Sequence, residues 1–187
     1  CAGVGYTGLR VRGVDATRIN ITLNGIPVND AEDQGVYFVD IPDLASSTSS
    51  IQLERGVGTS TNGAGAFGAT MSISTLQQFD SAGAIFSSSY GSFNTMKNTL
   101  IAGTGMLKGG WQFDVRLSKI SSDGYIQRSA SDLKSLQITA GWKASAKTWF
   151  HFMAMAGTEK TGQAWDGVPQ DSLKTNRTYN ELGLESN

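Results

Sequence analysis

The clearest pattern in this chain is an alternation of apolar and polar residues in its second half. Residues 111–118 and 136–143 alternate regularly, and residues 149–154 do so less cleanly. A period of two is typical of β-strands that have one apolar and one polar face. With residues 83–90 and 95–107 added, the sequence predicts about five strands, several of them long.

The first 76 residues have a different pattern, in which short alternating runs are separated by irregular segments. Strands are predicted over residues 19–23, 50–55 and 68–75. Asn24-Gly25, directly after the first of these strands, is a strong hairpin signal. Residues 36–44 are expected to form a loop and a short helical turn. The sequence therefore predicts an α/β-like piece of low helix content, followed by a strand-rich region.

The spacing of the long strands favours a transmembrane barrel. Roughly 9–11 tilted residues cross a bilayer, and outer-membrane barrels have short turns at one end and longer loops at the other. The connections at 108–110 and 144–146 are short, and those at 121–132 and from 157 onward are long. The short connection at 91–94 departs from this pattern. A water-soluble β-sandwich also alternates, so the strands alone leave both architectures open.

Composition removes several other classes of protein. The formal net charge of −1 gives no sign of a nucleic-acid binder, and Cys1 is the only cysteine, which excludes a disulfide framework. No run approaches the roughly 18 apolar residues of a membrane helix. A membrane location would therefore have to come from β-strands.

Four spaced segments in the first half form an ordered series. They are Arg-Val-Arg-Gly at 10–13, Leu-Asn-Gly-Ile-Pro at 23–27, Leu-Glu-Arg-Gly at 53–56 and the glycine-rich residues 63–69. This series resembles the second half of the plug domain of TonB-dependent outer-membrane receptors. The resemblance is strongest over residues 8–75 and looser beyond them.

The resemblance implies a mainly β fold, with an α+β plug at 1–76 and the first antiparallel strands of an outer-membrane barrel at 77–187. Because such barrels have about 22 strands, we expect the chain to be an internal piece of a larger receptor. The expected missing parts are the signal peptide, the TonB box, the first half of the plug and most of the barrel.

The implied function is TonB-dependent transport of a nutrient across the outer membrane of a Gram-negative bacterium, with the plug gating the barrel. A ferric siderophore or another iron complex is the commonest expectation. The implied partners are TonB, outer-membrane lipid and a small-molecule or metal-complex ligand, with a surface lipoprotein as a further option. The alternative is a secreted, soluble β-rich binding or adhesion module.

The resemblance also indicates candidate site residues. Two plug apices are expected to face the external cavity and to contact ligand, one before Arg10 and one after the Asn-Gly turn. Their candidate residues are Tyr6, Thr7, Asn29, Asp30, Glu32, Asp33 and Gln34. Arg10, Arg12 and Arg55 are expected to hold the plug in the barrel, since guanidinium groups pair well with carboxylates. Arg10 and Arg12 are placed on one face of a strand.

Residues 63–68 match G-x-G-x-x-G, the pattern of dinucleotide-binding loops. That loop must open a helix, whereas here the next residues alternate like a strand. His151 is the only histidine, and no catalytic set of side chains can be assembled. We therefore expect no enzyme, no cofactor and no metal site.

Overall fold

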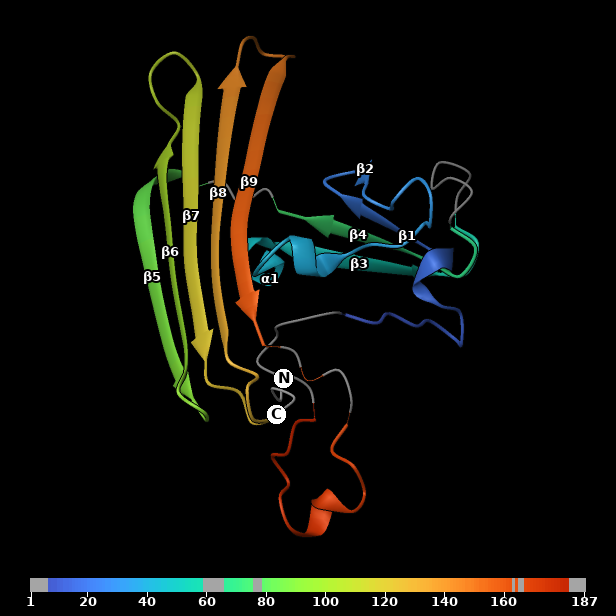
Figure 1. Cartoon of the computed structure of the whole chain (residues 1–187). Coiled ribbons are helices and arrows are strands. Elements are labelled where there is room, and N and C mark those ends of the chain that lie inside the picture. Colours follow the sequence, from blue (N-terminus) through green and yellow to red (C-terminus); the bar gives the residue numbers. More distant parts are fainter. Residues whose placement is uncertain (1–6, 59–65, 76–78, 163, 165–166, 182–187) are drawn as a thin grey trace.

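The computed structural model describes residues 7–58, 66–75, 79–162, 164 and 167–181. Its strands form two sheets that lie side by side (Figure 1). We call the four-stranded sheet β1–β4 the small sheet and the five-stranded sheet β5–β9 the wall. The strands of the small sheet run across the direction of the wall strands, at about the middle of their height.

The small sheet has the strand order β2-β1-β4-β3. Its strands are β1 (Ile19–Leu23), β2 (Ile26–Pro27), β3 (Ser50–Arg55) and β4 (Ala69–Ser74). β1 and β4 pair in parallel, and the other two pairs are antiparallel. The connection from β2 to β3 carries two short helical turns, η2 (Phe38–Asp40) and α1 (Leu44–Ser47). A third turn, η1 (Ala16–Arg18), leads into β1.

The core of the molecule lies on the small sheet. Ile19, Ile21, Ala69 and Ile73 are buried there, and Phe38 and Leu44 pack against them from the long connection. Gly68 is required at the start of β4, because a Cβ atom there would lie 2.7 Å from Val14 Cγ1. Gly68 thus permits close packing ahead of a strand, and not the start of a helix, while residues 63–65 lie outside the described residues.

The Asn24-Gly25 turn joins β1 to β2 as predicted, with a positive φ at both residues. Beyond this short hairpin, the side chain of Asn29 takes the place of a strand partner for β1. Its Oδ1 accepts from the backbone of Ile21 at 2.8 Å, and its Nδ2 donates to the carbonyls of Ile19 at 2.9 Å and Gln34 at 2.8 Å.

The wall is an antiparallel meander in which each strand pairs with the next. Its strands are β5 (Ser81–Gly91), β6 (Thr95–Gly105), β7 (Trp111–Ser122), β8 (Ser131–Lys143) and β9 (Trp149–Thr161). All five predicted strands are therefore present, and most are longer than their alternation indicated. The outer edges of β5 and β9 have no partner strand among the described residues.

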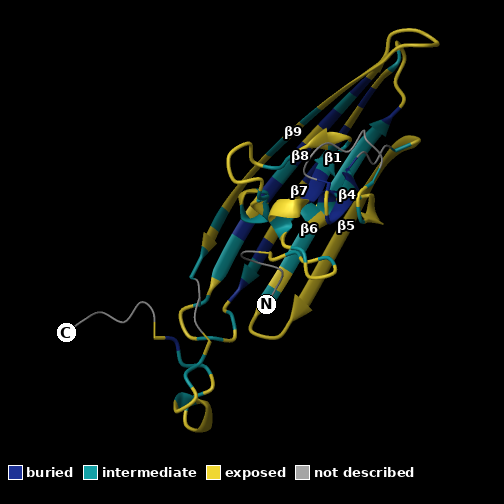
Figure 2. Cartoon of the chain, turned by 90° about the vertical axis from the view of Figure 1, so that its right-hand side faces the viewer, coloured by how far each residue is buried: buried dark blue, intermediate teal, exposed yellow. Residues whose placement is uncertain are grey.

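Burial along the central wall strands is the reverse of that in a soluble protein. On β7, Gln112, Asp114, Arg116 and Ser118 are buried, whereas Phe113 and Leu117 are 42% and 46% exposed. β8 repeats this pattern, with Gln137 and Thr139 buried and Ile138 exposed. Figure 2 shows the alternation as stripes along both strands. The polar face of the wall is turned toward the small sheet, and the apolar face is turned outward.

The outward face has an apolar band with an aromatic row at one border. Trp111 lies opposite Trp142, with ring centroids 5.2 Å apart, and Phe150 stacks on Trp142 at 5.6 Å. At the other border, Lys119 lies opposite Lys134. Lys119 is eight positions beyond Trp111 on β7, or about 26 Å along the strand. This is the scale of the roughly 25 Å apolar band of outer-membrane barrels.

The wall strands connect by short turns at one end, through residues 106–110 and 144–148. At the other end lie the short turn at 92–94, the loop at 123–130 and the segment after β9, which includes η4 (Ser172–Lys174). Among the described residues, no helix is long and apolar enough to span a membrane.

The prediction of a strand that carries Arg10 and Arg12 is wrong. Val11 and Val14 form an isolated bridge around a tight turn, and Arg12 in this turn has a φ of 53°.

We expect Ile138→Arg to reduce assembly of the complete protein in the outer membrane. Ile138 lies opposite Val115 near the middle of the apolar band, where an arginine costs about 2–4 kcal/mol. Thr158→Arg is the control, because Thr158 lies opposite Lys134 at the border, where the cost is about 0–1 kcal/mol. The measurement is the yield of heat-modifiable, folded protein in outer-membrane fractions. Equal yields for the two variants would show that the outward face does not contact lipid.

We expect Asn29→Ala to loosen the edge of β1. The change removes three hydrogen bonds and leaves the buried Ile21 N–H without its acceptor, at a cost of about 1–3 kcal/mol. Hydrogen exchange at the Ile21 amide measures this local opening directly. Glu32→Ala is the control, because Glu32 is exposed in the same loop. Unchanged protection of Ile21 in Asn29→Ala would contradict the role given to Asn29.

Candidate functional site

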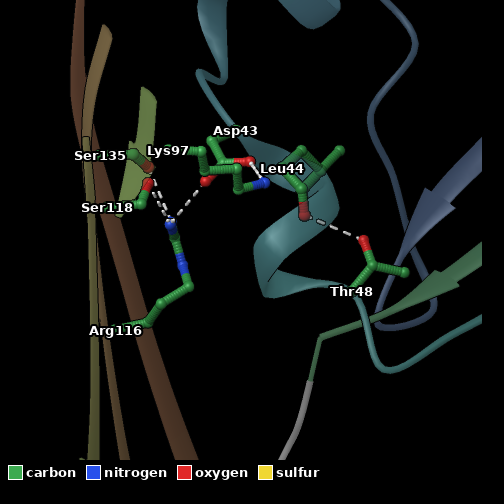
Figure 3. Close-up of polar contacts among 7 residues, drawn as sticks. All are labelled: Asp43, Leu44, Thr48, Lys97, Arg116, Ser118 and Ser135. Atoms are coloured by element: carbon green, nitrogen blue, oxygen red, sulfur yellow. Dashed lines mark hydrogen bonds and ion pairs between the residues drawn. The ribbon is translucent and has the colours of Figure 1, made fainter. Parts of the chain in front are cut away.

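The candidate functional site is the interface between the small sheet and the wall, and its centre is Asp43. The side chain of Asp43 is 3% exposed and accepts from Lys97 Nζ of β6 at 2.8 Å. Its second oxygen lies 3.7 Å from Arg116 Nη1 of β7. Figure 3 shows the two wall cations converging on this carboxylate. A single acid of the N-terminal part thus meets two cations of the wall.

Both partners of this contact are held in place by their own surroundings. Arg116 donates to Ser118 Oγ at 2.9 Å and to Ser135 Oγ at 2.7 Å, so that neighbouring strands fix the guanidinium group. Asp43 precedes α1 and has a φ of 53°. Few residues other than glycine adopt this left-handed region, although Asp does so more readily than most. The backbone strain at Asp43 is offset by the contacts of its side chain.

The environment of Asp43 keeps it ionised. Burial raises the pKa of its carboxyl, but hydrogen bonds from Lys97, Ser118 and Ser46 and the charge of Lys97 more than offset this, and the pKa lies below its usual value of 3.8. The stabilisation that the charge provides is therefore present above about pH 3.8 and is lost as the pH falls through the lower, folded-state pKa.

A second contact lies at the Asn24-Gly25 turn. Asn24 binds Thr75 twice at 2.8 Å, once through each atom of its side-chain amide. Thr75 Oγ1 and Asn24 Nδ2 both point at Met153 Sδ of β9, at 3.1 and 3.4 Å. Gln137 of β8 donates to the carbonyl of Thr75 at 3.3 Å. The turn that closes the first hairpin therefore also touches the wall.

A third contact joins the start of the wall to β7. The backbone carbonyl of Phe79 accepts from Gln112 Nε2 at 3.0 Å, and its N–H donates to Asp114 Oδ1 at 3.4 Å. All three contacts use polar side chains of the inner face of the wall. The interface is therefore bound in part by hydrogen bonds and ion pairs, alongside the buried apolar side chains of Ile120 and Leu133.

A small cavity of about 20 Å³ lies within this interface, bounded by α1, Thr75 and strands β6–β8. Such a volume has room for about one water molecule. Its lining includes Ser47, Asp114, Arg116 and Gln137, each of which has a buried polar atom without a protein hydrogen-bond partner. A water molecule in the cavity could therefore bind some of these polar atoms.

Arg10, Arg12 and Arg55, predicted to hold the plug, are exposed. The ion pairs between the small sheet and the described part of the wall involve Asp43 and none of these arginines. The charges are thus opposite to those expected, because the acid lies in the connection between β2 and β3 and the cations are on the wall. The assignment of the three arginines as barrel contacts stays a prediction.

Among the residues predicted to contact ligand, Tyr6 lies outside the described residues and Thr7 is exposed. The loop at 29–34 makes its own hydrogen bonds. Asp30 Oδ1 accepts from the backbone of Glu32 and Asp33, while Asp33 accepts from the Gly35 N–H and the Tyr37 hydroxyl. The Tyr37 and Gly35 hydrogen bonds lower the pKa of Asp33.

These contacts separate the roles of the loop residues. Asn29 and Gln34 support the loop conformation, Asn29 through β1 and Gln34 through its Nε2 bond to the Ala31 carbonyl at 3.2 Å. Asp30, Glu32 and Asp33 are all exposed at this apex. No three potential metal-binding side chains cluster in the part of the chain that the structure describes. Ligand contact by this loop remains a prediction.

The sequence did not indicate Asp43 as a contact residue. The alternation over residues 111–118 already placed Arg116 on the polar face, whereas Lys97 of β6 was not assigned to a face. Asp43 lies in an irregular segment next to Pro42, where no periodicity marks the direction of a side chain. One side of the contact was therefore readable from the sequence, and the other was not.

Comparison with known proteins agrees with this geometry. Residues 2–70 match the family model described as TonB-dependent Receptor Plug Domain. No curated protein sequence matches the chain. Among solved structures, the chain is similar to the ferric citrate transporter FecA in its unliganded form, with a TM-score of 0.74 and 17% identity over 94% of this chain and 28% of that one.

Two further structures show the same fold. The copper transporter OprC has a TM-score of 0.65 and 18% identity, over 84% of this chain and 27% of that one. The siderophore receptor PiuA from Acinetobacter baumannii has a TM-score of 0.66 and 13% identity, over 84% of this chain and 22% of that one. The chain thus spans about a quarter of the length of these structures. Residues 2–70 are thus similar to the plug domain of TonB-dependent receptors, and the two sheets have the fold of the plug and barrel strands of these structures.

Proposed function

We propose that this receptor imports a ferric siderophore or another iron complex across the outer membrane in a TonB-dependent step, with residues 1–76 gating a barrel that begins at residues 77–187. The observation that carries the gating is the polar interface around Asp43. Support for an iron substrate comes from the ferric citrate transporter and the siderophore receptor among the similar structures.

A polar interface suits a plug that must move. Separating an apolar interface exposes apolar surface at about 25 cal/mol per Å². The side chains that lose contact when this interface separates are Asp43, Lys97, Arg116 and Gln137, and water can solvate all of them. The cavity, which Arg116 and Gln137 help to line, gives water a first place to enter. Displacement of the plug therefore exchanges protein hydrogen bonds for water hydrogen bonds, which have similar energies.

The proposed ligand route passes the plug apices. Thr7 and Glu32 are exposed, and Asp30 and Asp33 shape the second apex. The proposed partners are TonB on the periplasmic side and a surface lipoprotein as an option on the external side. Lipid covers the outward face of the wall in this proposal.

We expect loss of the complete receptor gene to reduce growth under iron limitation and to reduce uptake of radioactive iron supplied as siderophore complexes. Uptake by the intact strain should stop when TonB is absent or the proton gradient is dissipated. Copper uptake, measured in parallel, tests the metal transported by one of the similar structures. A defect in copper uptake with normal iron uptake would overturn the iron assignment. Normal uptake of all tested substrates without TonB would overturn TonB-dependent transport.

We expect Asp43→Asn to loosen the plug by about 1.5–3 kcal/mol, the range for a hydrogen bond to a charged group. The measurement is the urea concentration at which the plug of the complete receptor becomes sensitive to protease. Because the pKa of Asp43 is lowered in the folded state, the difference from wild type should hold from pH 7 to pH 5 and shrink below about pH 4. Asp80→Asn is the control, since Asp80 is exposed. Equal shifts in both variants would contradict the role of Asp43.

A further inference from the structure

A row of small residues crosses the inner face of the wall. Gly157 of β9 lies opposite Ser135 of β8, which lies opposite Ser118 of β7, and Ser118 lies opposite Thr99 of β6. The three hydroxyl side chains of this row are buried. The neighbouring rows of the same face carry larger side chains, which are Arg116, Gln137 and Met155 on one side and Ile120, Leu133 and Glu159 on the other.

The glycine at the end of this row is in contact with Pro42, in the connection from β2 to β3. Gly157 lies on an edge strand and its backbone is exposed, but the direction in which a side chain would point is occupied. A Cβ atom there would lie 3.0 Å from both Cγ and Cδ of Pro42, and 3.0 Å from the carbonyl oxygen of Lys134 on β8. Carbon atoms in ordinary contact are about 3.5–4.0 Å apart. A side chain at position 157 would therefore push aside the buried Pro42 ring or the neighbouring strand.

Pro42 directly precedes Asp43, and the two residues have little freedom to move independently. The proline ring fixes the φ of its own residue near −65°, and Asp43 follows in the left-handed region with a φ of 53°. The Pro42 ring lies against β9, whereas the Asp43 carboxylate lies against cations of β6 and β7. Two consecutive residues thus contact three strands of the wall, and a shift at one contact displaces the other.

We propose that Gly157 is a positioning residue of the plug: the space left by its missing side chain seats Pro42, and this contact brings Asp43 to its two cations. The inference rests on the gating proposed above and adds the steric contact that sets the closed position. The energy of an ion pair falls gradually with distance, whereas packed atoms tolerate little displacement. Gly157 therefore defines where the plug sits, and the ion pairs of Asp43 stabilise it there.

The test measures opening of the plug in the complete, folded receptor as the rate of protease cleavage in mild urea. When opening is fast relative to cleavage, this rate follows the population of the open plug. We expect Gly157→Ala to raise the rate about 10-fold, because a methyl group inserted into a packed contact is destabilising. The matched control is Gly83→Ala, on the same face of β5, where a Cβ atom would lie 3.5 Å from Phe79. A rate for Gly157→Ala no higher than that of the control would overturn the proposal.

A compensating variant separates the contact with Pro42 from strain between β8 and β9. Pro42→Ala removes the two ring carbons that the new methyl group would meet. Pro42→Ala/Gly157→Ala should therefore be cleaved more slowly than Gly157→Ala alone. Cleavage of the double variant at the same or a higher rate would show that the methyl group acts through the Lys134 carbonyl, and Gly157 would then have no role in seating the plug.

A second pair of variants tests the seat with Gly157 in place, and folded yield in the membrane shows whether each variant assembles. Because Pro42 positions Asp43, Pro42→Ala/Asp43→Asn should be cleaved at nearly the rate of Asp43→Asn alone. An increase equal to the product of the two single increases would show independent contacts and would contradict the seat. The cleavage assay uses no substrate, so a negative result here is distinct from a failure of iron uptake or of TonB dependence.

Discussion

The polar inner face of the wall is the constraint on which the rest of the structure depends. A strand that turns apolar side chains outward must turn its alternate side chains inward, because successive residues point to opposite faces. Gln112, Asp114, Arg116 and Gln137 are buried for this reason. Buried polar groups need hydrogen-bond partners, so the element that lies against this face must itself be polar where it makes contact. The small sheet meets that requirement through Asp43, Thr75 and Asn24.

The same constraint divides the apolar core of the small sheet from the polar groups that contact the wall. The small sheet keeps its apolar residues, such as Ile19 and Ile73, for its own core, and it presents polar groups and turns to the wall. The strained backbone at Asp43 fits this division, because a left-handed conformation at the entrance to α1 brings a carboxylate to two fixed cations. The apolar core of the small sheet is thus separate from the polar contacts that this part of the chain makes with the wall.

The two borders of the outward face differ in chemistry. One border carries the stacked row of Trp111, Trp142 and Phe150, whose rings suit the interface between acyl chains and headgroups. The other border carries lysines in register on neighbouring strands. The two ends of the apolar band thus differ in the described part of the wall, with stacked rings at one border and a facing pair of lysines at the other.

The sequence by itself determined the strands and their faces. A period of two is a local property, so the alternation over residues 111–118 predicted both β7 and the inward direction of Arg116. The Asn24-Gly25 hairpin also depends only on local backbone preferences. The parallel pairing of β1 with β4, the structural use of Asn29 and the meeting of Asp43 with Lys97 were decided only by the tertiary structure. Each of these joins residues that no local periodicity relates, through loops whose course is set by packing against the rest of the molecule.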